Sequence, residues 1–285
     1  RRTPCSKEVK YLAELKLISP LLSNMEVVKN VSIRGGTSVY LVRSTRTQQT
    51  YILKHISVPE SQRQVDALIY TGAAATKEDA QKYYEQVVAD YQAELETLEQ
   101  LSSSPNLDCY RSYQIAPKDD GVGYDVYLLA ENRKTLVDYL AENAVTHLTA
   151  LNLGLDLCNA LIDLRAAGLV HRDVKPSNIY LSAQGHFVLG DLGIAKIEEL
   201  KYCSMPEHML SPYSAPELFS LVGSIDKTTD IYSAGLILYR IFNGSHGPFE
   251  DEQTTAKAAD KRRVTGEALP APMYADYEMA EIILK

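Results

Sequence analysis

The feature that most limits the fold of this chain is a change in its hydrophobic pattern partway along the sequence. Around residues 26–57, three short stretches alternate apolar and polar residues and are rich in Val, Ile and Tyr: MEVVKNVSI, SVYLVRS and TYILKHISV. A period of two residues is typical of β-strands, and Gly35-Gly36 predicts a turn between the first two. Residues 109–116 and 124–130 predict a further hairpin. The first part of the chain is therefore expected to form a small antiparallel sheet.

The rest of the chain has a helical pattern. Thr76 is a candidate N-cap for a long helix at about 77–101, and the later part of the chain is mainly helical, with its longest apolar-faced segment at 148–168. A sheet with one principal helix, followed by a helical region, predicts an α+β fold with two domains, 1–131 and 132–285. Ligands commonly bind in the cleft between two such domains.

Composition excludes several classes of function. The 285 residues carry a formal net charge of −8, so an extended basic surface for nucleic acid or anionic lipid is not expected. A local basic cleft is still compatible with this charge. The four cysteines include no C-x-x-C pair, which argues against a metal site built from them. No apolar run reaches the roughly 18 to 20 residues that cross a bilayer. We therefore expect a cytoplasmic protein, or the cytoplasmic portion of a longer one, that contacts neither nucleic acid nor membrane.

The stretch H-R-D-V-K-P-S-N at 171–178 carries the clearest chemical signal. It places a carboxylate (Asp173), a cation two positions on (Lys175) and an amide oxygen five positions on (Asn178) in one short loop, and Asp191 follows in D-L-G. Transfer of a phosphoryl group needs a carboxylate to orient the attacking hydroxyl, a cation near the moving phosphate, and oxygen ligands for Mg²⁺. The segment therefore predicts phosphoryl-transfer chemistry.

These motifs resemble those of the protein kinase family. H-R-D-x-K-x-x-N is followed by D-L-G in place of the usual D-F-G and then by Ala215-Pro216-Glu217, in the order that the family shows. Lys175 is similar to the serine/threonine type, and the motif style resembles bacterial members. The resemblance spans roughly residues 25–285 and implies a bilobal fold, with a small antiparallel-sheet N-lobe that includes the long helix and a larger, mainly helical C-lobe.

The resemblance also implies roles for the loop residues. Asp173 would be the catalytic carboxylate, Lys175 would steady the transferring phosphate, and Asn178 with Asp191 would hold Mg²⁺. His171 and Leu192 would pack behind the site, and Leu192 still supplies apolar volume where the family has Phe.

Lys54, in the strand TYILKHI, stands where the resemblance implies the family's phosphate-binding lysine. A lysine on an apolar central strand is costly to bury unless it is paired, so its partner should lie on the inward face of the long helix. That face is defined by Val87, Val88, Tyr91, Leu95, Leu98 and Leu101. Glu94 lies roughly 50° from its centre, against about 90° or more for Asp90, Glu96 and Glu99. Glu94 is therefore the predicted partner, and the resemblance implies that the pair grips the phosphates of ATP.

The glycine-rich loop departs from the family pattern. An ungapped fit of that pattern places other residues at its glycine positions, namely Ser32, Arg34 and Thr37. A loop one residue shorter instead brings Gly35 and Gly36 near the second glycine and the residue after it. Both glycines are retained as candidate phosphate contacts.

The resemblance implies an adenine pocket as well. Its expected lining is Val39 and Tyr180 on either side of the base, Ile52 as its roof, Ala130 as gatekeeper, and the hinge from Glu131 to Arg133. The alanine predicts an accessible back pocket, and Ile52 predicts a tighter roof.

The stretch from Asp191 to Glu217 is a candidate activation segment. Candidate self-phosphorylation sites in it are Ser204, Ser211 and Ser214. Arg172 could pair with a phosphate there and order the segment. In the next helical stretch, Asp230 resembles the aspartate that anchors the backbone of the family's catalytic loop.

Two further departures concern length. Lys54 and Glu94 are further apart in sequence than in most kinases, so residues near 58–80 are expected to be an insertion with an extra helix, which either packs on the small domain or offers a partner or regulatory surface. The family continues beyond the position of Lys285 with two helices and an arginine partner for the A-P-E glutamate. The C-lobe is therefore expected to be incomplete, Glu217 to lack that partner, and the chain to be less stable than a longer version.

The sequence thus favours an ATP- and Mg²⁺-dependent protein kinase acting on serine or threonine hydroxyls of a protein substrate. Two alternatives stay open. One is a pseudokinase or scaffold that binds nucleotide weakly or not at all, which the degraded glycine loop and Ile52 would suit. The other is a small-molecule phosphotransferase of related fold, which would not be expected to carry Arg172, Lys175 and the A-P-E segment together.

Overall fold

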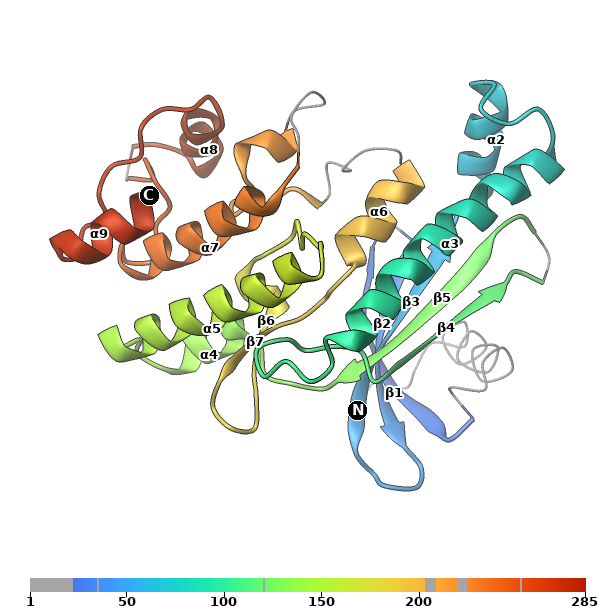
Figure 1. Cartoon of the computed structure of the whole chain (residues 1–285), viewed down its shortest axis with the longest axis horizontal. Helices are drawn as coiled ribbons and strands as arrows, with labels where there is room; N and C mark the ends of the chain where they lie inside the picture. Colours follow the sequence, from blue (N-terminus) through green and yellow to red (C-terminus); the bar gives the residue numbers. More distant parts are fainter. Residues whose placement is uncertain (1–22, 35, 120, 203–208, 220–224, 252) are drawn as a thin grey trace. The chain divides into compact units, whose positions relative to one another are not determined.

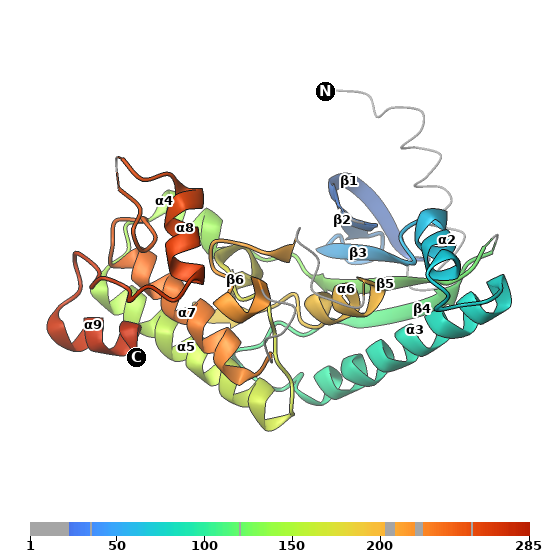
Figure 2. The same ribbon diagram turned by 90° about the horizontal axis from the view of Figure 1, so that it is seen from above.

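A computed structural model describes residues 23–34, 36–119, 121–202, 209–219, 225–251 and 253–285 (Figures 1 and 2). The chain divides into two compact units. The first comprises Arg1–Ala93 and Tyr110–Asn132, and the second comprises Glu94–Cys109 and Arg133–Lys285. Residues 94–109 thus fall in the second unit. The sequence instead indicates a single domain boundary after Glu131, and this boundary stays a prediction.

The first unit is built on a five-stranded antiparallel sheet with the strand order β1-β2-β3-β5-β4. The strands are β1 (Met25–Arg34), β2 (Thr37–Ser44), β3 (Thr50–Val58), β4 (Ser112–Pro117) and β5 (Tyr124–Glu131). Gly36 forms the turn between β1 and β2 at a φ of +70°, a left-handed backbone that favours glycine. The strands predicted from the alternating pattern are therefore confirmed.

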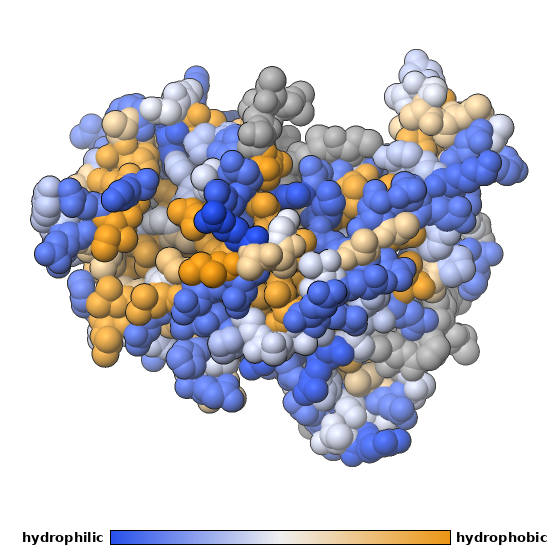
Figure 3. Space-filling model, in the orientation of Figure 1, coloured by the Kyte–Doolittle hydropathy of each residue, from blue (hydrophilic) through white to orange (hydrophobic). Residues whose placement is uncertain are grey.

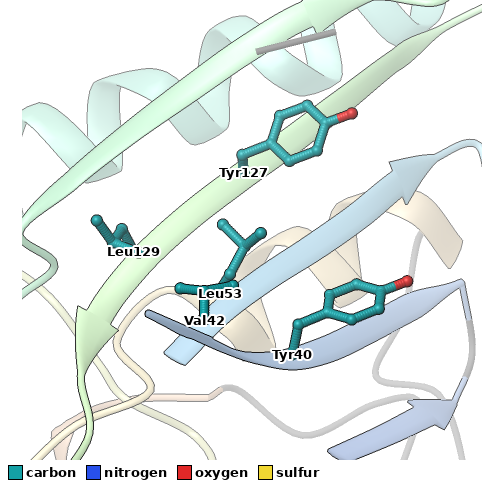
Figure 4. Close-up of a cluster of buried hydrophobic side chains, with 5 residues drawn as sticks. All are labelled: Tyr40, Val42, Leu53, Tyr127 and Leu129. Carbon is teal, nitrogen blue, oxygen red and sulfur yellow. The ribbon is translucent and has the colours of Figure 1, made fainter. Parts of the chain in front are cut away.

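One face of this sheet holds an apolar core. Figure 4 shows its members, which come from three adjacent strands: Tyr40 and Val42 of β2, Leu53 of β3, and Tyr127 and Leu129 of β5. All five are buried. Because side chains alternate between the two faces of a strand, the intervening residues of these strands point to the opposite face.

Two helices belong to the segment between β3 and β4. Helix α2 (Gln62–Tyr70) lies within the stretch for which an extra helix is expected. Helix α3 (Lys77–Gln100) begins after Thr76, whose hydroxyl accepts a hydrogen bond from the Asp79 N–H at 3.1 Å. This is the predicted N-cap. The predicted apolar face of α3 is buried at Val87, Val88, Tyr91, Leu95 and Leu98, and Leu101 beyond the helix is partly buried.

The second unit is mainly helical. Its helices are α4 (Leu136–Glu142), α5 (His147–Ala166), α6 (Ile194–Tyr202), α7 (Lys227–Ile241), α8 (Ala256–Val264) and α9 (Tyr277–Leu284), with short 3₁₀ turns at Pro176–Asn178 and Pro216–Phe219. Strands β6 (Ile179–Leu181) and β7 (Phe187–Leu189) form a two-stranded ladder. Buried Asp156 of α5 accepts hydrogen bonds from the Phe187 N–H and from Asn106 Nδ2, both at 2.8 Å. The first bond joins α5 to the ladder that flanks the catalytic loop, and the second joins α5 to the segment that contains Asn106.

Apolar side chains also reach the surface of the second unit. Figure 3 shows them gathered over α5 and α9, and the exposed ones on α5 are Leu148, Leu151, Leu155 and Ile162. A hollow of about 350 Å³ lies between α5, α7 and α9. Among the described residues, no helix combines the length and the apolar character needed to span a membrane.

Candidate active site

The loop from His171 to Asn178 is anchored to α7 by one carboxylate. The backbone N–H groups of His171 and Arg172 each donate to a different oxygen of Asp230, both at 2.7 Å. Asp230 is buried, and burial raises the pKa of its carboxyl, whereas the two N–H donors and His171 oppose that rise. The predicted anchor is therefore confirmed. It holds the loop while Arg172 adopts a φ of +67°.

Asp173 stands at the centre of this loop. Its Oδ2 atom lies 2.7 Å from Lys175 Nζ and accepts a hydrogen bond from Asn178 Nδ2 at 3.0 Å. Its Oδ1 atom is buried and has no hydrogen-bond partner within the described part of the chain. Burial raises the pKa of the Asp173 carboxyl, and Lys175, His171 and Asn178 counteract the rise. One oxygen is thus held in place while the other remains available to a substrate proton.

Asn178 and Asp191 present oxygens of the kind that Mg²⁺ prefers. The Asn178 amide nitrogen donates two bonds to Asp173, one to the carboxylate and one to the backbone carbonyl at 2.9 Å. The Asn178 side-chain oxygen accepts from the Ser177 hydroxyl at 3.3 Å and keeps a second lone pair for an ion. The Gly190 N–H donates to the backbone carbonyl of Asn178 at 2.9 Å, which places Asp191 next to the end of the catalytic loop. Mg²⁺ is usually bound by one or two carboxylates together with substrate phosphates. The residues present fit that ion.

The first unit contributes a second group of predicted residues, which share one face of its sheet. In the strand register Val39 is opposite Lys54, and Ile52 is opposite Ala130. These four residues lie on the face opposite the apolar core. Lys54 is only 6% exposed and stands on β3 between β2 and β5, so it is not an exposed edge lysine. Gly36 has the left-handed turn described above, and Gly35 lies outside the described residues.

Glu94 is the half-buried acidic residue on its part of α3. The other candidates, Asp90, Glu96 and Glu99, are exposed. Burial raises the pKa of the Glu94 carboxyl, and the charges of Arg172 and Lys196 oppose the rise. Glu94, the predicted partner, is thus the acidic residue of this group that is withdrawn from solvent. Lys54 belongs to the first unit and Glu94 to the second, and their pairing stays a prediction.

Three residues predicted to contact adenine or the hinge have protein partners. Arg133 Nε donates to buried Asp108 at 2.8 Å, and the Tyr180 hydroxyl donates to Asp191 Oδ1 at 2.8 Å. Glu131 accepts from Arg111 Nε at 2.5 Å. Their contacts with a nucleotide stay predictions. The Tyr180–Asp191 bond was not predicted from the sequence, because the expected adenine pocket involves only the ring of Tyr180.

Comparison with known proteins agrees with this geometry. The protein kinase domain family matches residues 34–283. This chain belongs to the protein kinase family. It is 31% identical over 173 residues to a probable serine/threonine-protein kinase of Clostridium perfringens, which is 58% of this chain and 24% of that protein. It is 31% identical over 172 residues to rat serine/threonine-protein kinase 16, which is 54% of this chain and 55% of that protein.

A third relative, the bovine dual serine/threonine and tyrosine protein kinase, is 38% identical over 100 residues, which is 34% of this chain and 10% of that protein. The matched parts therefore span from a tenth to about half of these three proteins. The family, with its bilobal α+β fold, is shared, whereas the relatives' names describe proteins that are longer than the matched parts.

The activation segment of this kinase domain begins as a helix. Helix α6 starts three residues after Asp191, and its Glu199 forms an ion pair with Arg172. On its buried side, Lys201 and Glu198 form a second ion pair at 2.9 Å. Arg172, the expected partner of a phosphate, is thus engaged by a carboxylate of the segment itself.

The end of the segment is held by a hydrogen-bonded turn. The Ser214 hydroxyl accepts from the Ser211 N–H at 2.9 Å, and buried Arg263 of α8 donates to the Ser214 carbonyl at 2.6 Å. Ser214 is only 3% exposed, whereas Ser211 is half-buried. Ser204 lies outside the described residues. Glu217 accepts from the Thr229 hydroxyl at 2.6 Å, a partner that the sequence did not indicate, and the absence of the family's arginine stays a prediction.

Proposed function

We propose that this chain is a protein serine/threonine kinase that transfers the γ-phosphate of ATP, with Mg²⁺, to hydroxyl groups of a protein substrate. The observation that carries the proposal is the state of Asp173. One of its carboxylate oxygens is held by Lys175 and Asn178, and the other is buried and has no partner among the described residues. Membership of the protein kinase family supports the same chemistry.

The residues of the second unit would each have a different role in phosphoryl transfer. Asp173 accepts or orients the proton of the attacking hydroxyl, because its Oδ1 atom can accept a hydrogen bond. Lys175 places a positive charge 2.7 Å from Asp173, where the transferring phosphate would pass. Asn178 and Asp191 would hold Mg²⁺, which when bound neutralises charge on the phosphate oxygens. Asp230 keeps the loop in register through its two backbone bonds.

The first unit would bind the nucleotide. We assign the face with Val39, Ile52, Lys54 and Ala130 to ATP, because these residues are neighbours in the strand register and Lys54 is withdrawn from solvent. Glu94 would complete the phosphate grip. The serine/threonine class rests on Lys175 in the catalytic loop and on the names of the bacterial and rat relatives.

Self-phosphorylation, where it occurs, is assigned to Ser204 or Ser211 in preference to Ser214. Both the Ser211 and the Ser214 hydroxyl accept a backbone hydrogen bond. Ser214 is buried whereas Ser211 is half-buried, so a phosphate on Ser214 would have to break the turn. A cytoplasmic location suits an ATP-dependent enzyme, and it agrees with the free thiols of Cys109 and Cys158 in the described part of the chain.

The test is transfer of γ-labelled phosphate from ATP to a generic protein substrate, with Mg²⁺ and after addition of EDTA. We expect Mg²⁺-dependent label on serine or threonine. Label on tyrosine alone would contradict the assigned class. A chain that shows neither transfer nor a nucleotide-induced rise in melting temperature would be better described as a scaffold, which is the alternative that the altered glycine loop favours.

A further inference from the structure

A hydrogen bond between two neighbouring loops links a tyrosine to the expected metal ligand. The Tyr180 hydroxyl, on β6, donates to Oδ1 of Asp191 at 2.8 Å. At neutral pH a tyrosine is an uncharged donor and an aspartate an acceptor. The bond therefore engages Oδ1 of Asp191 and makes the two carboxylate oxygens inequivalent.

The surrounding backbone places the tyrosine ring for this bond. Tyr180 is opposite Val188 in the β6–β7 ladder, and Asp191 comes three residues after Val188. Between them, a Cβ atom added to Gly190 would lie 2.7 Å from the Tyr180 ring, a separation that side chains do not adopt. The ring thus fits only because residue 190 is glycine. The bond depends on the strand register and on this glycine together.

The backbone conformation of Asp191 is unusual for a residue other than glycine. Asp191 adopts a φ of +60°, in the left-handed region that non-glycine residues enter at a cost. Asp191 lies between β7 and α6, outside both elements. A hydrogen-bonding neighbour limits the rotation of its side chain and selects which oxygen faces an incoming ion.

We propose that Tyr180 is a positioning residue for the metal site: its hydroxyl holds Asp191 Oδ1, so that Asp191 presents Oδ2 to Mg²⁺ in the ATP complex. The inference rests on the proposed function, because it presumes a metal-nucleotide complex at Asn178 and Asp191. It differs from the contact with adenine that the sequence predicts for Tyr180, which would involve the ring alone. The two roles are separable, since phenylalanine keeps the ring and removes the hydroxyl.

The experiment compares wild type with Tyr180→Phe in Mn²⁺ binding, measured by the electron paramagnetic resonance signal of free Mn²⁺ at saturating ADP. Partners of metal ligands typically contribute about 10-fold or more in metal affinity. We expect Tyr180→Phe to bind Mn²⁺ about 10-fold more weakly, with metal-free ADP affinity unchanged because the ring remains.

The matched control is Tyr277→Phe, which removes an exposed hydroxyl that also donates to a carboxylate at 2.8 Å, that of Glu281. It should bind Mn²⁺ like wild type. Equal or tighter Mn²⁺ binding by folded Tyr180→Phe would overturn this inference alone. If wild type fails to bind Mn²⁺ with ADP, the proposed function falls and this inference falls with it.

Discussion

Replacing Asp230 by asparagine should weaken the anchor of the catalytic loop. The Asp230 carboxylate accepts the N–H groups of His171 and Arg172, each at 2.7 Å, on two different oxygens. The carboxamide of Asp230→Asn has the same shape but only one acceptor atom, and its NH₂ group would face the second N–H. The substitution therefore removes one charge-assisted bond and leaves one buried donor without a partner.

The expected cost follows from these two losses. A hydrogen bond to a charged group contributes about 1.5–3 kcal/mol, and an unsatisfied buried polar group costs about 1–3 kcal/mol. Because the two figures describe partly the same loss, we expect about 3 kcal/mol of lost stability. For a chain of this size that lowers the melting temperature by roughly 6–12 °C. Phosphoryl transfer should fall as well, since the loop that carries Asp173 is no longer held.

The assay is thermal unfolding of the purified chain, with Asp226→Asn as the control. Asp226 caps the same helix, α7, and accepts from the Thr228 N–H at 2.7 Å on an exposed surface. Asparagine is as good an N-cap as aspartate, so this variant should melt with wild type. Equal melting temperatures for Asp230→Asn and Asp226→Asn would refute the reasoning.

Three further outcomes are expected. Burial raises the pKa of the Asp173 carboxyl and Lys175 counteracts that rise, so Lys175→Met should move the acid limb of the kcat/KM profile to higher pH. A limb that stays in place would contradict this cause. Ser214→Ala should lower the free energy of unfolding in urea by about 1 kcal/mol, because the hydroxyl is a buried hydrogen-bond acceptor. For the same reason the variant should incorporate as much phosphate as wild type, measured by mass spectrometry. Arg263→Met should lower the free energy of unfolding in urea by about 2 kcal/mol, because it removes the buried bond to the Ser214 carbonyl. Arg262→Met, which changes an exposed neighbouring side chain, should unfold like wild type.

The sheet and the catalytic loop were predictable because their signals are local. The alternation that places Leu53 in the core also places Lys54 on the opposite face, and the strand register then sets Val39 beside it. Likewise, Asp173, Lys175 and Asn178 lie within six residues of one another in the chain, so a short loop must bring them together. Neither conclusion required knowledge of distant contacts.

What the sequence did not reveal depends on distant contacts. The start of the activation segment is a helix whose Glu199 pairs with Arg172, which lies 27 residues earlier in the chain. The bond from Tyr180 to Asp191 requires the β6–β7 register and the absence of a side chain at Gly190. Neither arrangement leaves a periodic or spaced pattern. The bond from Thr229 to Glu217 was not predicted for the same reason, since Thr229 reaches it from another helix.

The central claim is that Asp173 carries out phosphoryl transfer, and steady-state transfer from ATP to a protein substrate by wild type and Asp173→Ala tests it most directly. Removing a positioned general base typically costs about 100-fold or more in rate. We expect at least that loss in Asp173→Ala, with a nucleotide-induced rise in melting temperature like that of wild type. Equal rates of transfer by the two proteins would contradict the account.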